Sequence, residues 1–115
     1  MTACDAWIGA RVDATFRLTP GEHRDDILAR HGPAFPTGHR AFTLVLNGIR
    51  DLRYRGCAIA PLIHACTLPK RELGDLVDQC SAHDSLEHLV ERWREVRAYV
   101  DALPDGHYVV IVSEL

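Results

Sequence analysis

Residues 107–112, with the sequence HYVVIV, decide the fold of this 115-residue chain. Five of the six are β-branched or aromatic, a composition that favours a β-strand, and the turn residues Pro104-Asp105-Gly106 mark where that strand begins. Residues 109–112 are uniformly apolar, whereas a strand with one solvated face alternates apolar and polar side chains. The segment therefore predicts a strand that is covered on both faces, or that pairs with another chain.

A second strand is predicted near the opposite end of the chain, over residues 8–18. The even positions from Ile8 to Leu18 are all apolar, and the odd positions include Arg11 and Asp13. This period of two is typical of a strand with one buried face. We expect the two terminal strands to pair in a small antiparallel sheet.

The segment after the first strand predicts a helix. Thr19-Pro20-Gly21-Glu22 has the spacing of a capping box with proline at the first helical position. The helix that it opens would carry Ile27 and Leu28 inward and stop at Gly32-Pro33. Residues 33–40 are expected to form a loop.

Residues 41–55 allow two interpretations. Asn47-Gly48 is a strong hairpin signal, but the hairpin would set Leu44 opposite Asp51 across the two strands. A helix instead gathers the apolar side chains on one face, with Gly56 as its stop. We therefore favour a helix over these residues.

Three more helices are predicted before the last strand. Pro61 opens a short one over residues 61–66, and Pro69 opens another, which buries Leu73, Leu76, Val77 and Cys80. A second capping box, residues 84–87, begins the longest helix. The apolar residues at helical spacing in that helix are Leu86, Leu89, Val90, Trp93, Val96, Val100 and Leu103.

These elements indicate an α+β protein with a single domain, residues 1–115. We expect a two-layer arrangement in which about four to five helices cover one face of the antiparallel sheet formed by the N- and C-terminal strands. The composition, 47% hydrophobic and 25% charged, is that of an ordinary globular domain.

The chain shows no sign of a membrane span or an export signal. Its longest nearly uncharged stretch, residues 57–69, is shorter than the roughly 20 apolar residues that a bilayer span needs. The first residues lack a basic segment followed by an apolar run. We therefore expect a cytoplasmic protein, in which the four scattered cysteines are reduced thiols.

The net charge of −3 conceals two halves of opposite sign. Residues 1–71 carry ten basic and six acidic side chains, and residues 72–115 carry three basic and ten acidic ones. The candidate partner-binding residues form an acidic row on the longest helix with support from the helix before it: Asp84, Glu87, Glu91, Glu95, Glu72 and Asp75. The row is either a solvated helix face or a surface that docks on a basic partner. Exposed carboxylates lack the burial that tunes a catalytic acid, so no catalytic residue is assigned.

Two other sites are weaker hypotheses. Arg50, Arg53 and Arg55 form a basic cluster that would suit a nucleic-acid-associated accessory protein, although no DNA- or RNA-binding motif accompanies them. Another hypothesis is a structural zinc site. Its ligands would be Cys57, Cys66, Cys80 and His83.

The sequence gives no positive sign of catalysis or of a cofactor. His64 and Cys66 would point apart on a helix, so they would not form a nucleophile and base pair. Phosphate-binding loops and the serine nucleophile elbow are absent from the sequence. We expect no cofactor and no metal.

A short, acidic, single-domain chain without a catalytic signature resembles the small inhibitors encoded by phages and mobile elements, the anti-CRISPR proteins above all. The acidic row, residues 84–95, is the feature that carries this resemblance. The resemblance implies a non-enzymatic inhibitor that occupies a basic surface of a larger effector or nuclease. Toxin-neutralising immunity proteins share the same profile. The chain is also a candidate homodimer, either through its two oppositely charged halves or through an exposed edge of the HYVVIV strand.

Overall fold

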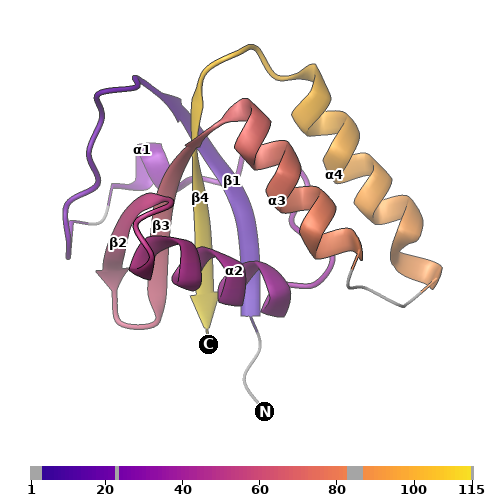
Figure 1. Cartoon of the computed structure of the whole chain (residues 1–115), viewed down its shortest axis with the longest axis horizontal. Helices are drawn as coiled ribbons and strands as arrows, with labels where there is room; N and C mark the ends of the chain where they lie inside the picture. The colour runs from indigo at the N-terminus through magenta and orange to yellow at the C-terminus, as the bar shows by residue number, and fades with distance from the viewer. Residues whose placement is uncertain (1–3, 23, 83–86, 115) are drawn as a thin grey trace.

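The computed structural model describes residues 4–22, 24–82 and 87–114. Four strands form one antiparallel sheet in the order β1-β4-β3-β2, and four helices and a 3₁₀ turn connect them (Figure 1). In chain order the elements are β1 (Cys4–Val12), α1 (Asp25–Leu28), α2 (His39–Arg50), β2 (Arg55–Ala60), β3 (Ile63–Pro69), α3 (Lys70–Ala82), η1 (Glu87–Leu89), α4 (Val90–Ala102) and β4 (His107–Glu114).

The apolar strand β4 lies in the middle of the sheet. It pairs with β1 along one edge and with β3 along the other, both antiparallel. Tyr108, Val110 and Val112 pack into the core on one face, and Val109 and Ile111 pack into the core on the opposite face. The predicted cover on both faces is confirmed. Because both edges of β4 are paired within the chain, the exposed edge that was predicted as a homodimer contact is wrong.

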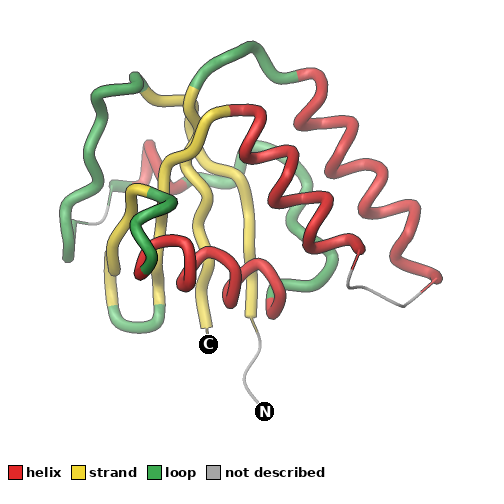
Figure 2. The backbone as a smooth tube through the Cα atoms, in the orientation of Figure 1, coloured by secondary structure: helices red, strands yellow, loops and turns green. Residues whose placement is uncertain are grey.

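Helices α2, α3 and α4 cover one face of the sheet (Figures 1 and 2). Their buried side chains join β1, β3 and β4 in the larger of two hydrophobic cores. The predicted buried stripe of α3 is confirmed, since its four members are all at most 1% exposed: Leu73, Leu76, Val77 and Cys80.

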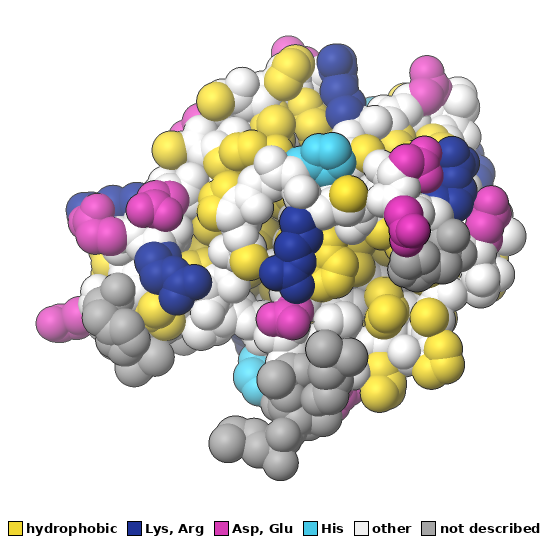
Figure 3. Space-filling view, turned by 180° about the vertical axis from the view of Figure 1, so that it is seen from behind, with side chains coloured by type: hydrophobic (Ala, Val, Ile, Leu, Met, Phe, Trp, Pro, Cys, Tyr) yellow, Lys and Arg dark blue, Asp and Glu magenta, His cyan; other side chains and the backbone are white. Residues whose placement is uncertain are grey.

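The other face of the sheet is covered by α1 and the segment around it. Leu28 of α1 packs with Ile59, Val109 and Ile111 in the second core, and the indole Nε1 of Trp7 donates a 2.7 Å hydrogen bond to the carbonyl oxygen of Leu28. Figure 3 looks onto this side, where hydrophobic side chains reach the surface between charged ones. The expectation that all helices lie on one face is therefore correct for α2, α3 and α4 and wrong for α1.

The first strand is shifted from its predicted position of residues 8–18. It begins at Cys4 and ends at Val12, where Asp13 starts a turn by accepting hydrogen bonds from the amide and hydroxyl of Thr15 at 2.8 and 2.7 Å. Local side-chain bonds of this kind compete with strand pairing. A β-bulge between Ile8 and Arg11 also moves Val12 to the opposite face from Ile8, which the regular alternation conceals.

The capping box predicted at residues 19–22 forms a turn instead of a helix start. The amide of Glu22 donates to the carbonyl of Thr19, and Gly21 has a φ of 78°. Proline followed by glycine at positive φ is the signature of a type II turn. Helix α1 is only four residues long and begins later, although Leu28 is buried as expected.

The short helix predicted over residues 61–66 is wrong, because this segment belongs to a β-hairpin. Strands β2 and β3 pair through a turn at Pro61 and Leu62. Ala65, Cys66 and Leu68 are all completely buried, on both faces of the sheet. A strand buried on both faces has no alternation that would separate it from a helix.

The helix predicted over residues 41–55 is confirmed as α2, but it ends at Arg50 and not at Gly56. Leu52 has a φ of 62°, and the amide of Arg53 donates to the carbonyl of Gly48 at 2.8 Å. This is a Schellman-type end with leucine in the left-handed position that glycine normally occupies. Leu52 is 89% exposed.

The longest predicted helix is shorter at its start. The described part opens with the 3₁₀ turn η1, and α4 begins at Val90, which is 42% exposed and not in the core as predicted. Trp93, Val96 and Val100 are buried as predicted. The second capping box, at residues 84–87, falls largely outside the described residues.

Substitutions in β4 test its burial on both faces. We expect Ile111→Ala to destabilise the protein by about 2–5 kcal/mol and Val110→Ala by roughly 2 kcal/mol, because adjacent side chains fill different cores. Urea unfolding measures both. The control is Val90→Ala at the exposed start of α4, which should cost less than about 0.5 kcal/mol. A large loss at only one of the two β4 positions would contradict a strand covered on both sides.

Leu52→Gly is expected to stabilise the protein by roughly 0.5–1 kcal/mol. Leucine in the left-handed region costs about 1–2 kcal/mol, and glycine removes this cost. The net gain is smaller, because glycine makes the unfolded chain more flexible and so increases the entropy lost on folding. Leu52→Ala is the matched control, because alanine keeps the strained Cβ. Thermal melting curves compare the three proteins, and an equal gain from alanine would show that the left-handed conformation is not the cause.

Candidate functional site

The predicted acidic row lies at the exposed start of the α4 segment. Glu87 in η1 and Glu91 and Glu95 in α4 are all exposed. Glu91 accepts a hydrogen bond in an ion pair with Arg94, one turn later. Asp84, the predicted first member, lies outside the described residues. The structure therefore brings the three glutamates onto one exposed stretch, where one of them is paired.

Arginine side chains neutralise some of the carboxylates on α3 and α4. Arg97 of α4 lies between α3 and α4, with its Nε 3.7 Å from Asp78 Oδ1 and 3.5 Å from Asp101 Oδ1. A Cβ at Gly74 would lie 2.1 Å from Nη1 of Arg97, so the glycine makes room for this guanidinium. Among the described residues, Glu87 and Glu95 form no ion pair, and they carry the unbalanced negative charge of the row.

The two supporting acids lie elsewhere. The start of α3 lies beside the end of α4, where Lys70 Nζ donates to the carbonyl of Asp101 at 3.0 Å. Glu72 and Asp75 are therefore two to three turns away from the start of α4. Asp75 lines a concavity of about 250 Å³ with Lys70 and other charged residues, and Glu72 lines a different, basic concavity. Neither extends the row of Glu87, Glu91 and Glu95.

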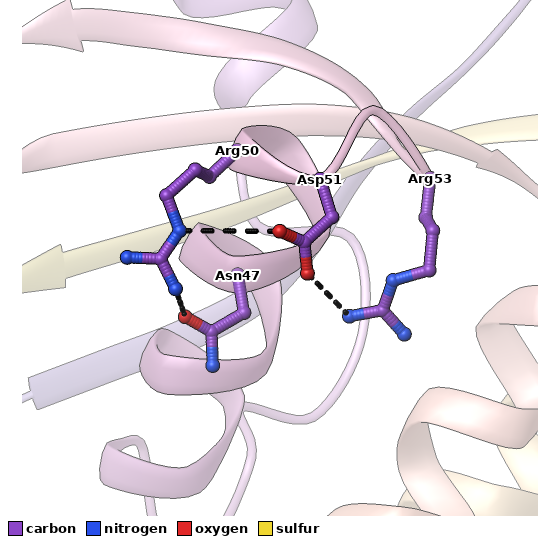
Figure 4. Close-up of polar contacts among 4 residues, drawn as sticks. All are labelled: Asn47, Arg50, Asp51 and Arg53. Carbon is purple, nitrogen blue, oxygen red and sulfur yellow. Dashed lines mark hydrogen bonds and ion pairs between the residues drawn. The ribbon is translucent and has the colours of Figure 1, made fainter.

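The three arginines of the predicted basic cluster do not form one surface. Figure 4 shows Arg50 donating from Nη2 to Asn47 Oδ1 at 2.7 Å, with its Nε 4.0 Å from Asp51 Oδ1. Arg53 approaches the other oxygen of Asp51 at 3.8 Å. Arg53 and Arg55 line a concavity that Arg50 does not reach.

The predicted zinc ligands do not converge. Cys66 and Cys80 belong to the core under α2, α3 and α4, whereas Cys57 packs on the opposite side of the sheet. His83 lies outside the described residues. Within residues 4–22, 24–82 and 87–114, no three His, Cys, Asp or Glu side chains gather as metal ligands would.

The buried thiols are poorly suited to nucleophilic attack. Burial raises the pKa of the Cys66 thiol, and it raises the pKa of Cys80 to about 12. His64 and Cys66 occupy alternate positions of β3 and so share one face of the sheet. In the described structure no hydrogen bond joins them. Because the thiolate is the reactive form, Cys66 is held as an unreactive thiol.

The fold also forms a polar cluster that was not predicted from the sequence. The concavity lined by Arg53, Arg55 and Glu72 also includes Thr67 and His107. These residues come from the α2–β2 turn and from four different parts of the chain. The pairing of β2, β3 and β4, which no sequence pattern predicted, brings the strand residues of this cluster together.

Comparison with models of known families, with curated proteins and with solved structures finds no match. None of the helices in the described part of the chain has the length and apolar composition to span a bilayer.

The four thiols are expected to differ in reactivity. At pH 8 in the folded protein, iodoacetamide should modify the partly exposed Cys4 and Cys57 and leave Cys66 and Cys80 unmodified, because burial blocks access and lowers the thiolate fraction. Peptide mass spectrometry measures the modification of each site. In urea all four should react at similar rates, and modification of Cys66 in the folded protein as fast as that of Cys4 would contradict its burial.

Proposed function

We propose that this protein acts by binding a larger protein and not by catalysis, and that the acidic row of Glu87, Glu91 and Glu95 is the contact surface. The observation that carries this proposal is the exposure of all three carboxylates on one short stretch, with Glu87 and Glu95 unpaired by any described residue. Carboxylates held in this way are available for ion pairs with another molecule.

The partner is a protein with a basic surface, because charge complementarity speeds association and selects among partners. Nucleic-acid-processing effectors and nucleases carry such surfaces where they hold the phosphate backbone. A cytoplasmic inhibitor of the type encoded by phages and mobile elements, as in the anti-CRISPR proteins, would occupy that surface and exclude the nucleic acid. A nuclease toxin, neutralised by an immunity protein, would offer the same chemistry.

The acidic row combines charged and apolar contacts, and binding through it should be sensitive to salt. Val90, 42% exposed, lies between Glu87 and Glu91 and adds an apolar contact to the charged ones. Exposed ion pairs contribute little individually, about 0.2–1 kcal/mol. Binding through this surface therefore depends on several carboxylates together and weakens as ionic strength rises.

The test uses a panel of purified CRISPR effector complexes and nucleases, with DNA binding as the readout. The chain should inhibit DNA binding by at least one of them. The charge reversal Glu87→Lys/Glu95→Lys should weaken that inhibition by about tenfold or more, because two attractive contacts become repulsive. These two positions are chosen because their reversal breaks no ion pair within the described structure.

The matched control is Glu22→Lys/Asp105→Lys, which changes the net charge by the same amount at two exposed carboxylates that lie away from the row and form no ion pair among the described residues. It should inhibit as the unmodified chain does. Equal loss in both variants would show that net charge, and not the row, matters. Inhibition that is unchanged by the Glu87 and Glu95 reversal and insensitive to salt would contradict the proposed contact surface.

A further inference from the structure

A basic concavity of about 300 Å³ lies at the end of the sheet where β2 and β4 begin and β3 ends. Its polar lining consists of Arg53, Arg55, Thr67, Glu72 and His107. It lies beside the start of α3, away from the acidic row at the start of α4. An inference about this concavity is therefore independent of the proposed function of the row.

The strand register gathers three of the lining residues, Arg55, Thr67 and His107, on one face of the sheet. Arg55 pairs with Thr67 across β2 and β3, and Thr67 pairs with Val109 across β3 and β4. His107 precedes Val109 by two residues, so its side chain points to the same face. The arginine, the hydroxyl and the imidazole are thus placed side by side by backbone hydrogen bonding, without depending on flexible loops.

Hydrogen-bond donors in the concavity lack good acceptors. Arg55 Nη1 reaches the carbonyl of Ala14 only at 3.5 Å, and Arg53 lies 3.8 Å from Asp51. Thr67, only 9% exposed, adds a hydroxyl group to the lining. Two guanidinium groups and one hydroxyl therefore surround a space that a ligand with several acceptor oxygens would fill.

We propose that this concavity binds the phosphate group of a small phosphorylated molecule, a phosphate monoester. Guanidinium groups bind phosphate oxygens through paired hydrogen bonds. Pro69 and Glu72 also line the concavity, so the N-terminus of the 13-residue helix α3 lies beside it and adds a partial positive charge. Two arginines match the double negative charge of one monoester.

The arrangement fits a single phosphate group better than a nucleic-acid backbone. A nucleic-acid backbone needs a row of cations along its path, whereas the lining of the concavity supplies two arginines. Arg50, which precedes them in the sequence, is held by Asn47 and Asp51 outside the concavity. Glu72 adds one carboxylate to the lining. Its negative charge repels an anionic ligand, so removing that charge should strengthen binding, whereas removing an arginine should weaken it.

The first experiment titrates the protein with inorganic phosphate at constant ionic strength and follows amide and arginine side-chain NMR signals. Chemical-shift changes should saturate and concentrate at Arg53, Arg55, Thr67 and His107. Arg53→Gln and Arg55→Gln should each weaken binding about tenfold, since each removes a hydrogen bond between charged groups. Arg50→Gln is the matched control and should leave the affinity unchanged.

The variant Glu72→Gln should strengthen phosphate binding severalfold, because it removes a like charge from the lining. A gain in affinity cannot arise from loss of folding, so this variant keeps the test decisive if an arginine variant is unstable. The proposal is overturned if Arg50→Gln weakens binding as much as Arg55→Gln, or if shifts spread over surface arginines such as Arg17 and Arg92.

The second experiment distinguishes the source of the phosphate. Phenyl phosphate, a monoester, should bind at least as tightly as inorganic phosphate, and a short single-stranded DNA, which has only diesters, should bind weakly at the same site. Tight DNA binding that is lost in Arg53→Gln and falls steeply with salt would overturn the small-ligand proposal and indicate a nucleic-acid contact instead.

Discussion

The structure depends on the burial of β4 on both faces. A strand whose residues 108–112 are at most 3% exposed needs a neighbouring strand on each side and a layer of side chains above and below. β1 and β3 supply the hydrogen bonds, the three longer helices supply one layer, and α1 with its flanking loop supplies the other. The chain can meet these demands only by bringing its N-terminal strand beside its C-terminal one. The fold is thus closed by contacts between residues about a hundred positions apart.

Helices with a visible period, and the apolar run of β4, were predictable from sequence. The amphipathic helices α2 and α3 and most of α4 show their buried side chains at helical spacing, and the apolar run of β4 predicted its own burial. The β2–β3 hairpin was missed because β3 is buried on both faces, which removes the alternation that identifies a strand. The shift of β1 and the turn at Pro20 and Gly21 depend on a bulge and on local hydrogen bonds, which leave no periodic signal.

For the candidate sites too, residue spacing within one helix was predictable from sequence, and contacts between different elements were not. The spacing of Glu87, Glu91 and Glu95 was sufficient to predict an exposed acidic stretch. It was not sufficient to show that Arg94 pairs with Glu91, or that Arg97 lies between Asp78 and Asp101 on two different helices. Glu72 was grouped with the row because of its sign, but its position in the first turn of α3 places it in a concavity with Arg53 and Arg55. Net charge along the sequence therefore overstated the acidity of the helical layer.

The acidic row and the basic concavity lie near opposite ends of helix α4. Helix α4 has 13 residues, a length of about 20 Å. The acidic row lies at its start, and the basic concavity lies near its end, beside the start of the antiparallel helix α3. A molecule with this charge distribution turns its acidic end toward a basic surface as it approaches. In that orientation the concavity would face away from the proposed partner, so the proposed phosphorylated ligand would not compete with that partner for the same space. The separate positions of the acidic row and the basic concavity describe the charge of this chain better than the net charge of −3 does.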